Sequence, residues 1–136
     1  LQQRYPDRVC FYCGFNNKLA HHIEAGSDMF LMPSRFEPCG LNQMYSLRYG
    51  TVPIVRRTGG LGDSVQQFDP SSGKGTGVVF NHYDASALGW AINFALDLYP
   101  EKPVWRKLMR NGMAMDYSWE HQGQSYLDLF YRLTEK

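Results

Sequence analysis

The residues best suited to chemistry lie in one stretch, residues 33–41, which reads PSRFEPCGL. An apolar run at residues 29–32 precedes it and has the length of a buried strand, whereas residues 41–49 read as a helix. Because Pro38 disfavours a helical conformation at Glu37, the stretch is predicted to be a loop between the strand and the helix. Ligands of open α/β sheets bind at the carboxyl ends of the strands, which is where this loop would lie.

Two kinds of group in this loop are suited to ligand binding. The N–H groups of Cys39, Gly40 and Leu41 are expected to face a diphosphate, because the start of a helix carries unpaired donors and partial positive charge. The alternative is an ordinary capped helix. A carboxylate would repel phosphate, so Glu37 is expected to contact a neutral part of the ligand, such as a sugar. The alternative for Glu37 is a loop carboxylate that caps the helix.

A second loop, with Thr58, Gly59 and Gly60, follows the predicted strand at residues 51–56. Two consecutive glycines allow a ligand to approach the backbone closely. These three residues are therefore expected to contact the phosphate or the sugar of the same ligand. Paired glycines are also common in loops that bind nothing, and residues 59–63 would then form a plain glycine-rich turn.

Phe15 follows a further predicted strand at residues 9–14, which places it at the same edge of the sheet. An exposed aromatic ring there stacks on a nucleobase, a contact worth roughly 1–3 kcal/mol. The alternative is a core phenylalanine. Arg56 and Arg57 end the strand before the second loop, and they either hold phosphate or pair with surface acids.

Three motifs carry a resemblance to a known family. They are residues 33–41, residues 49–61 (YGTVPIVRRTGGL) and residues 116–119 (DYSW). Together they closely resemble the bacterial glycogen synthases and plant starch synthases, which are retaining glycosyltransferases of the two-domain GT-B architecture. The resemblance covers nearly the whole chain.

The resemblance implies roles for individual residues. Glu37 matches a glutamate that hydrogen-bonds the donor glucose near the reacting centre, and is therefore the expected catalytic residue. Phe15 matches an aromatic residue that covers adenine. Tyr45 stands where many members of the wider superfamily have a second glutamate, so the ribose contact is left unassigned. The implied substrates are ADP-glucose, with UDP-glucose as the alternative donor, and an α-1,4-glucan acceptor. No cofactor and no metal are expected.

The resemblance also shows what the sequence lacks. The family's paired arginine and lysine, which neutralise the donor diphosphate, have no clear counterpart, since Arg4 and Arg8 lie only a few residues before the first predicted strand. The amino-terminal domain that binds the glucan is absent. Residues 1–136 are therefore expected to be most of a donor-binding domain, incomplete at its N-terminus and inactive alone. The parent is expected in the cytoplasm of a bacterium or in a plastid stroma.

Two other classes of function remain for comparison. The first is a non-catalytic module that binds a nucleotide sugar or a glucan. The second, a dinucleotide-dependent oxidoreductase, is disfavoured because no G-x-G-x-x-G follows the first predicted strand. Among the 136 residues, 20% are charged and the formal net charge is +1, which gives no basis for a nucleic-acid or membrane partner. Cys10 and Cys13 have redox-motif spacing but lie in a strand-like run, so a buried structural role is expected.

The remaining elements continue an α/β alternation. Strands are predicted at residues 9–14, 28–33, 51–56 and 77–80, and helices at residues 18–25 and 41–49, from residue 84, from residue 103 and from residue 118. Pro53 near the start of its strand suits an edge strand. Trp90, Trp105 and Trp119 fall at helical positions and are expected in the core, with platforms for a glucan as the alternative. The fold class is α/β: a Rossmann-like parallel sheet with helical layers, the C-terminal half of a GT-B enzyme, followed by C-terminal helices.

Overall fold

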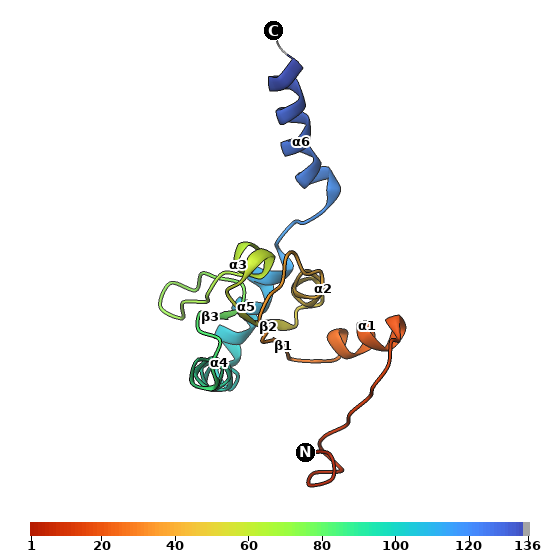
Figure 1. Ribbon diagram of the computed structural model, residues 1–136. Coiled ribbons are helices and arrows are strands. Elements are labelled where there is room, and N and C mark those ends of the chain that lie inside the picture. Colours follow the sequence, from red (N-terminus) through yellow and green to blue (C-terminus); the bar gives the residue numbers. More distant parts are fainter. Residues whose placement is uncertain (135–136) are drawn as a thin grey trace.

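The computed structural model describes residues 1–134, and a three-stranded parallel sheet forms its centre (Figure 1). The strands β1 (Met29–Met32), β2 (Val52–Arg56) and β3 (Val78–Phe80) lie in the order β1-β2-β3. Met29 pairs with Val52, and Ile54 pairs with Val78. Three of the four predicted strands are confirmed.

Within residues 1–134, six helices accompany the sheet. They are α1 (Asn17–Ala25), α2 (Asn42–Tyr49), α3 (Gly59–Ser64), α4 (Ala85–Leu98), α5 (Lys102–Met113) and α6 (Trp119–Thr134). The start of α1 is capped by the Asn16 side chain, which accepts a hydrogen bond from the Leu19 N–H. Helix α2 ends at Gly50, which adopts a left-handed φ of 81°.

Each face of the sheet buries its own apolar cluster, as the alternation of side chains along a strand requires. On one face, Val55 packs with Leu61 and Val65 from α3 and the residue after it. On the other face, Ile54 packs with Ala91 and Ala95 from α4. Figure 1 shows α3 and α4 on opposite sides of the strands. The sheet is therefore covered on both faces, as parallel sheets usually are.

The predicted strand at residues 9–14 is wrong. This segment forms no ladder with the sheet, and its residues are exposed apart from the half-buried Val9. Cys10 and Cys13 are exposed free thiols, not buried structural ones. A strand needs a neighbour to satisfy its N–H and C=O groups, and this segment has none among residues 1–134. Figure 1 shows it extending away from the sheet together with the N-terminus.

β2 is the central strand, so the expectation that Pro53 marks an edge strand is wrong. In a parallel strand successive residues bond to opposite neighbours, and the Val52 N–H donates to the Asp28 carbonyl on the β1 side at 3.0 Å. The Pro53 nitrogen therefore faces the β3 side, where pairing within the sheet begins only at Ile54. Because that position has no partner in β3, the lack of an N–H at Pro53 removes no hydrogen bond between the strands.

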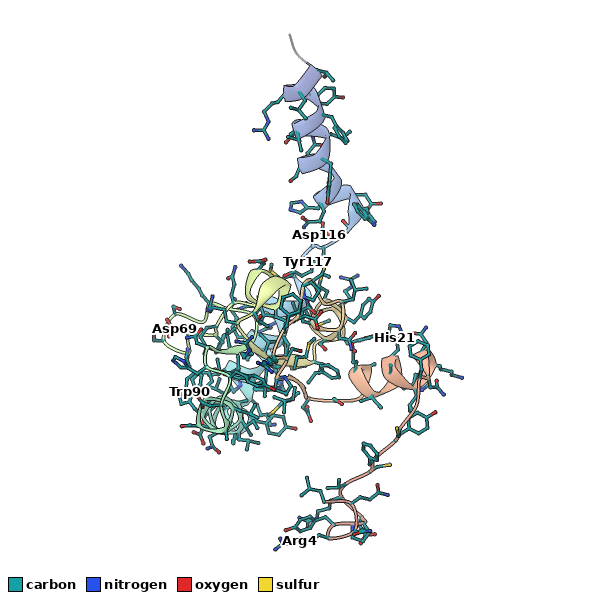
Figure 2. The ribbon with its side chains drawn as sticks, viewed as in Figure 1. Arg4, His21, Asp69, Trp90, Asp116 and Tyr117 are labelled. Carbon is teal, nitrogen blue, oxygen red and sulfur yellow. The ribbon has the colours of Figure 1, made fainter. Side chains whose placement is uncertain are left out.

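The three tryptophans differ in burial. Trp105 is 3% exposed and belongs to the core with Phe68 and Leu108. Trp90 and Trp119 are 50% and 77% exposed, so the prediction of a core position is wrong for both. Figure 2 shows Trp90 on α4, and its ring stacks on Phe94 with centroids 5.5 Å apart.

Candidate functional site

The loop between β1 and α2 lies at the carboxyl edge of the sheet and is held by Arg56. The Arg56 Nε donates to the Ser34 carbonyl at 2.8 Å, and its Nη2 donates to the Arg35 carbonyl. The guanidinium also lies 5.6 Å from the centre of the Tyr83 ring. Arg56 thus fixes the loop backbone and makes no ion pair with an acidic side chain in residues 1–134, so the expected acidic surface partner is not found.

The backbone at the start of α2 carries a run of unpaired donors. The N-cap residue is Leu41, which has no side-chain capping bond. The first helical hydrogen bonds are those from Met44 and Tyr45 to the Leu41 carbonyl. Within residues 1–134, the N–H groups of residues 39–43 have no hydrogen-bond partner. These N–H groups include the three predicted to face a diphosphate. Unpaired N–H groups at the start of a helix are the donors that bind an anion there.

The second loop packs directly against the first. A Cβ atom at Gly59 would collide with the Glu37 carbonyl, and one at Gly60 would collide with the Cys39 carbonyl. The Gly60 N–H donates to the Pro38 carbonyl at 3.3 Å. The two glycines therefore allow the two loops to approach each other. The sequence suggested that they make room for a ligand, whereas in the structure they make room for the first loop.

Residues 59–63 form most of helix α3, not a plain turn. Thr58 is its N-cap and makes no side-chain capping bond, like Leu41 at the start of α2. Because Gly60 touches the residues that lead into α2, the N-terminal ends of the two helices lie side by side. The positive ends of two helix dipoles thus converge at the carboxyl edge of β1 and β2.

Glu37 is half-buried, and its carboxylate makes no hydrogen bond or ion pair to the part of the chain that the structure describes. Since α2 has no side-chain cap, Glu37 does not cap it. The carboxylate is thus available to a ligand beside the two helix N-termini.

Phe15 lies outside this site. It is 95% exposed, so it is not a core residue, and it follows no strand that would bring it to the carboxyl edge. It lines a cavity of about 860 Å³ with His21 and Tyr45, whose rings lie 5.1 Å apart between α1 and α2. The His21 Nδ1 also lies 3.3 Å from the Tyr49 hydroxyl, so His21 joins the two helices and has a structural role.

A second cavity, of about 780 Å³, brings several predicted residues together. Cys39, Leu41 and Gly60 line it, with Gln43, Ser64 and Tyr117 beside them. Figure 2 shows Tyr117 on the connection between α5 and α6. The Tyr117 hydroxyl donates to the Ser64 carbonyl at 2.6 Å, and burial raises the pKa of this phenol.

Sequence reasoning missed Gln43 and Ser64. Gln43 is 1% exposed, which is unusual for an amide side chain on a helix. The signal available in the sequence was its position, four residues after Cys39, on the face of α2 that also carries Leu47. Ser64 lies 21 residues further along the chain, and no periodicity links it to Gln43.

Residues 1–134 contain neither a metal-binding cluster nor a membrane-spanning helix. Among residues 1–134, no three His, Cys, Asp or Glu side chains are grouped so that they could hold a metal ion. No helix there is long and apolar enough to span a membrane. The second strand-end arginine, Arg57, donates to the Asn81 side chain at 3.1 Å and is exposed.

Comparisons with known proteins agree with this geometry. Residues 1–111 match the family model described as "Glycosyl transferases group 1". The glycogen synthase of Koribacter versatilis is 53% identical over 130 residues, which is 96% of this chain and 27% of the relative. The glycogen synthase of Bacillus cereus is 49% identical over 135 residues, which is 99% of this chain and 28% of the relative. The chain thus spans little more than a quarter of the length of these relatives.

A solved structure is similar over nearly the whole chain. The catalytic domain of starch synthase IV from Arabidopsis thaliana, bound to ADP and acarbose, matches with a TM-score of 0.84 at 35% identity. The match covers 96% of this chain and 28% of that protein. It confirms the predicted fold class, an α/β domain of GT-B type.

Proposed function

The chain belongs to the group 1 glycosyl transferases, and from this premise we propose that it forms the nucleotide-sugar-binding part of a glucan synthase. The parent enzyme transfers glucose from ADP-glucose to the non-reducing end of an α-1,4-glucan and retains the anomeric configuration. The relatives named glycogen synthase and starch synthase support glucosyl transfer to a glucan. The likeness to a protein solved with ADP supports adenine as the base.

One observation carries the proposal: two uncapped helix N-termini meet at the carboxyl edge of the sheet. The unpaired N–H groups of Gly40 and Leu41 offer donors to a diphosphate, and the N-terminal end of α3 lies beside them. Donors fixed before the reaction stabilise negative charge as it develops, without reorganisation. In this proposal they hold the diphosphate leaving group as the bond to glucose breaks.

Glu37 serves the other half of the reaction. As the glucosyl–phosphate bond breaks, positive charge develops on the sugar ring. A carboxylate hydrogen-bonded to a glucose hydroxyl fixes the ring and stabilises that charge. Glu37 suits this role because its carboxylate has no partner among the described residues and its backbone carbonyl touches Gly59 at the start of α3.

Donor binding is the first test. NMR titration of the ¹⁵N-labelled chain with ADP-glucose should shift the amide signals of Gly40, Leu41 and Gly60, with a Kd in the millimolar range or about −4 kcal/mol. Weak affinity is expected because Arg56 and Arg57 are engaged elsewhere. The same titration with UDP-glucose distinguishes the two donors.

A pair of glycine variants sharpens this titration. Gly60→Ala forces the two loops apart and should abolish the shifts, whereas Gly89→Ala on α4, where nothing lies within 4 Å of the added Cβ, should leave them unchanged. Absence of shifts at residues 39–43 in the unaltered chain would refute the donor-binding role.

The second test concerns Glu37 in a longer enzyme that contains this chain. Charge-assisted hydrogen bonds contribute roughly 1.5–3 kcal/mol each, and about 1.4 kcal/mol is a factor of ten in rate. Glu37→Ala should therefore lower kcat roughly 10- to 1,000-fold and change the donor KM much less. Glu37→Gln keeps hydrogen bonding without the charge and should fall between. A near-normal kcat for Glu37→Ala would remove the residue from the mechanism.

A further inference from the structure

We infer that Gln43 is the positioning residue that sets the orientation of the N–H groups at the start of α2, a role that rests on the proposed function of that site. Its Nε2 lies 3.1 Å from the Cys39 carbonyl oxygen and 3.0 Å from the Gly40 carbonyl oxygen. The side chain is 1% exposed. One buried amide therefore holds two successive carbonyls of the turn that leads into the helix.

The orientation of the N–H groups follows from the geometry of the peptide bond. In a trans peptide the C=O and the N–H of one unit point in opposite directions, and no peptide bond among the described residues is cis. Because Gln43 holds the carbonyls of Cys39 and Gly40 inward, the N–H groups of Gly40 and Leu41 point away from it. These are two of the unpaired donors proposed to bind the diphosphate.

The turn is shaped to accept this side chain. Gly40 has a φ of +76°, and a Cβ there would lie 2.5 Å from the Gln43 Oε1. The Gln43 side chain thus occupies the space that a side chain at position 40 would need, and only glycine satisfies both the space and the backbone conformation.

Gln43 also connects the turn to α3. Its Nε2 lies 3.1 Å from the Ser64 Oγ, and the Ser64 hydroxyl donates to the Gly60 carbonyl at 2.5 Å. Because the Nε2 has two hydrogens for three acceptors, it shares its hydrogen bonds among the two carbonyls and the Ser64 Oγ, and one side chain thus links both helix N-termini. Gln43 acts through the backbone and reaches no ligand itself, so replacing it should loosen the donors without removing any of them.

The test compares Gln43→Met with Ser46→Ala. Gln43→Met keeps the volume of the side chain but removes its donor. Ser46 is a matched control, because it is also fully buried on α2 and its Oγ has no hydrogen-bond partner in the described part of the chain. Ser64→Ala removes only one of the three contacts of the Gln43 Nε2, together with the Ser64–Gly60 hydrogen bond, and provides a milder variant should Gln43→Met fail to fold.

Two readouts are measured on each protein. In the unaltered chain the NMR order parameters of Gly40 and Leu41 should be near 0.85, and in Gln43→Met they should fall below about 0.6. The affinity for inorganic pyrophosphate should fall about ten-fold in Gln43→Met, less in Ser64→Ala, and not at all in Ser46→Ala.

The outcomes separate the positioning role from the proposed function. If the unaltered chain binds neither pyrophosphate nor ADP-glucose, the proposed function is contradicted. The order parameters of Gly40 and Leu41 would still decide the role of Gln43. A folded Gln43→Met with unchanged order parameters and pyrophosphate affinity would overturn the positioning role. So would equal changes in Ser46→Ala. If only Ser64→Ala folds, unchanged readouts in that variant overturn it.

Discussion

Helices α5 and α6 have the same kind of sequence and opposite surroundings. Both were predicted from apolar residues at helical spacing, and both form. Helix α5 buries Trp105, Leu108 and Gly112, whereas α6 has no buried residue and its first residue, Trp119, is 77% exposed. Periodicity thus specifies a helix and its apolar face, but not whether a partner covers that face.

The partners of α5 come from distant parts of the chain. Trp105 and Leu108 share a cluster with Val52 from β2, Phe68 from the loop before β3, and Leu98 from α4. The apolar face of α6 meets no such surface in residues 1–134, and Figure 1 shows the helix extending away from the sheet. Most of the stability of a helix in a protein comes from such packing and not from its own propensity.

The largest expected effect is on stability, and it tests the difference in burial between α5 and α6. Leu108→Ala creates a cavity beside Trp105 and should lower the free energy of unfolding by about 2–5 kcal/mol. Leu129→Ala on α6, where the side chain is 44% exposed, should change it by no more than about 0.5 kcal/mol. Urea unfolding followed by circular dichroism measures both. Equal losses in the two variants would mean that α6 packs in solution as α5 does.

Replacing one glycine in each helix should change the free energy of unfolding by an intermediate amount, with opposite signs in α5 and α6. A Cβ at Gly112 on α5 would lie 2.8 Å from the Leu47 Cδ2, so overpacking should outweigh the helix-propensity gain and cost about 1 kcal/mol. At Gly123 on α6 nothing lies within 4 Å, so Gly123→Ala should stabilise its helix by up to about 1 kcal/mol. The same unfolding assay measures both. A stabilising Gly112→Ala would show that α5 is less tightly packed than the structure has it.

The same contrast explains how much of the fold was predictable. The strands around Leu31, Ile54 and Val79 were found because their apolar runs are short and bounded by loops. Residues 9–14 carry a similar signal but form no strand, since a strand depends on neighbours that its own sequence does not specify.

The candidate site was predictable in part. The strand–loop–helix order identified the loop around Glu37 and the donors of Gly40 and Leu41, because that arrangement is local. The contact of Gly60 with that loop and the bond from Gln43 to Ser64 depend on tertiary packing, and no residue spacing predicts either of them.

The smallest expected effect concerns α1, whose one buried residue is the carboxylate Glu24. It is 3% exposed and its Oε2 has no hydrogen-bond partner among the described residues. Burial raises its pKa above the ordinary 4.5, and the nearby His21 offsets this only in part. A carboxyl whose pKa is raised by folding is ionised at a cost, so its contribution to stability falls as the pH rises from 4.5 through the folded-state pKa.

Glu24→Gln removes that ionisation and keeps the shape of the side chain. It should raise the Tm at pH 7.5 and leave it close to that of the unaltered chain at pH 4, where the carboxyl is mostly protonated in both states. Glu120→Gln, which changes an exposed carboxylate on α6, should alter the free energy of unfolding by no more than about 0.5 kcal/mol. Thermal unfolding at the two pH values measures all three proteins. A lower Tm for Glu24→Gln at pH 7.5 would mean that the ionised carboxylate has a favourable partner.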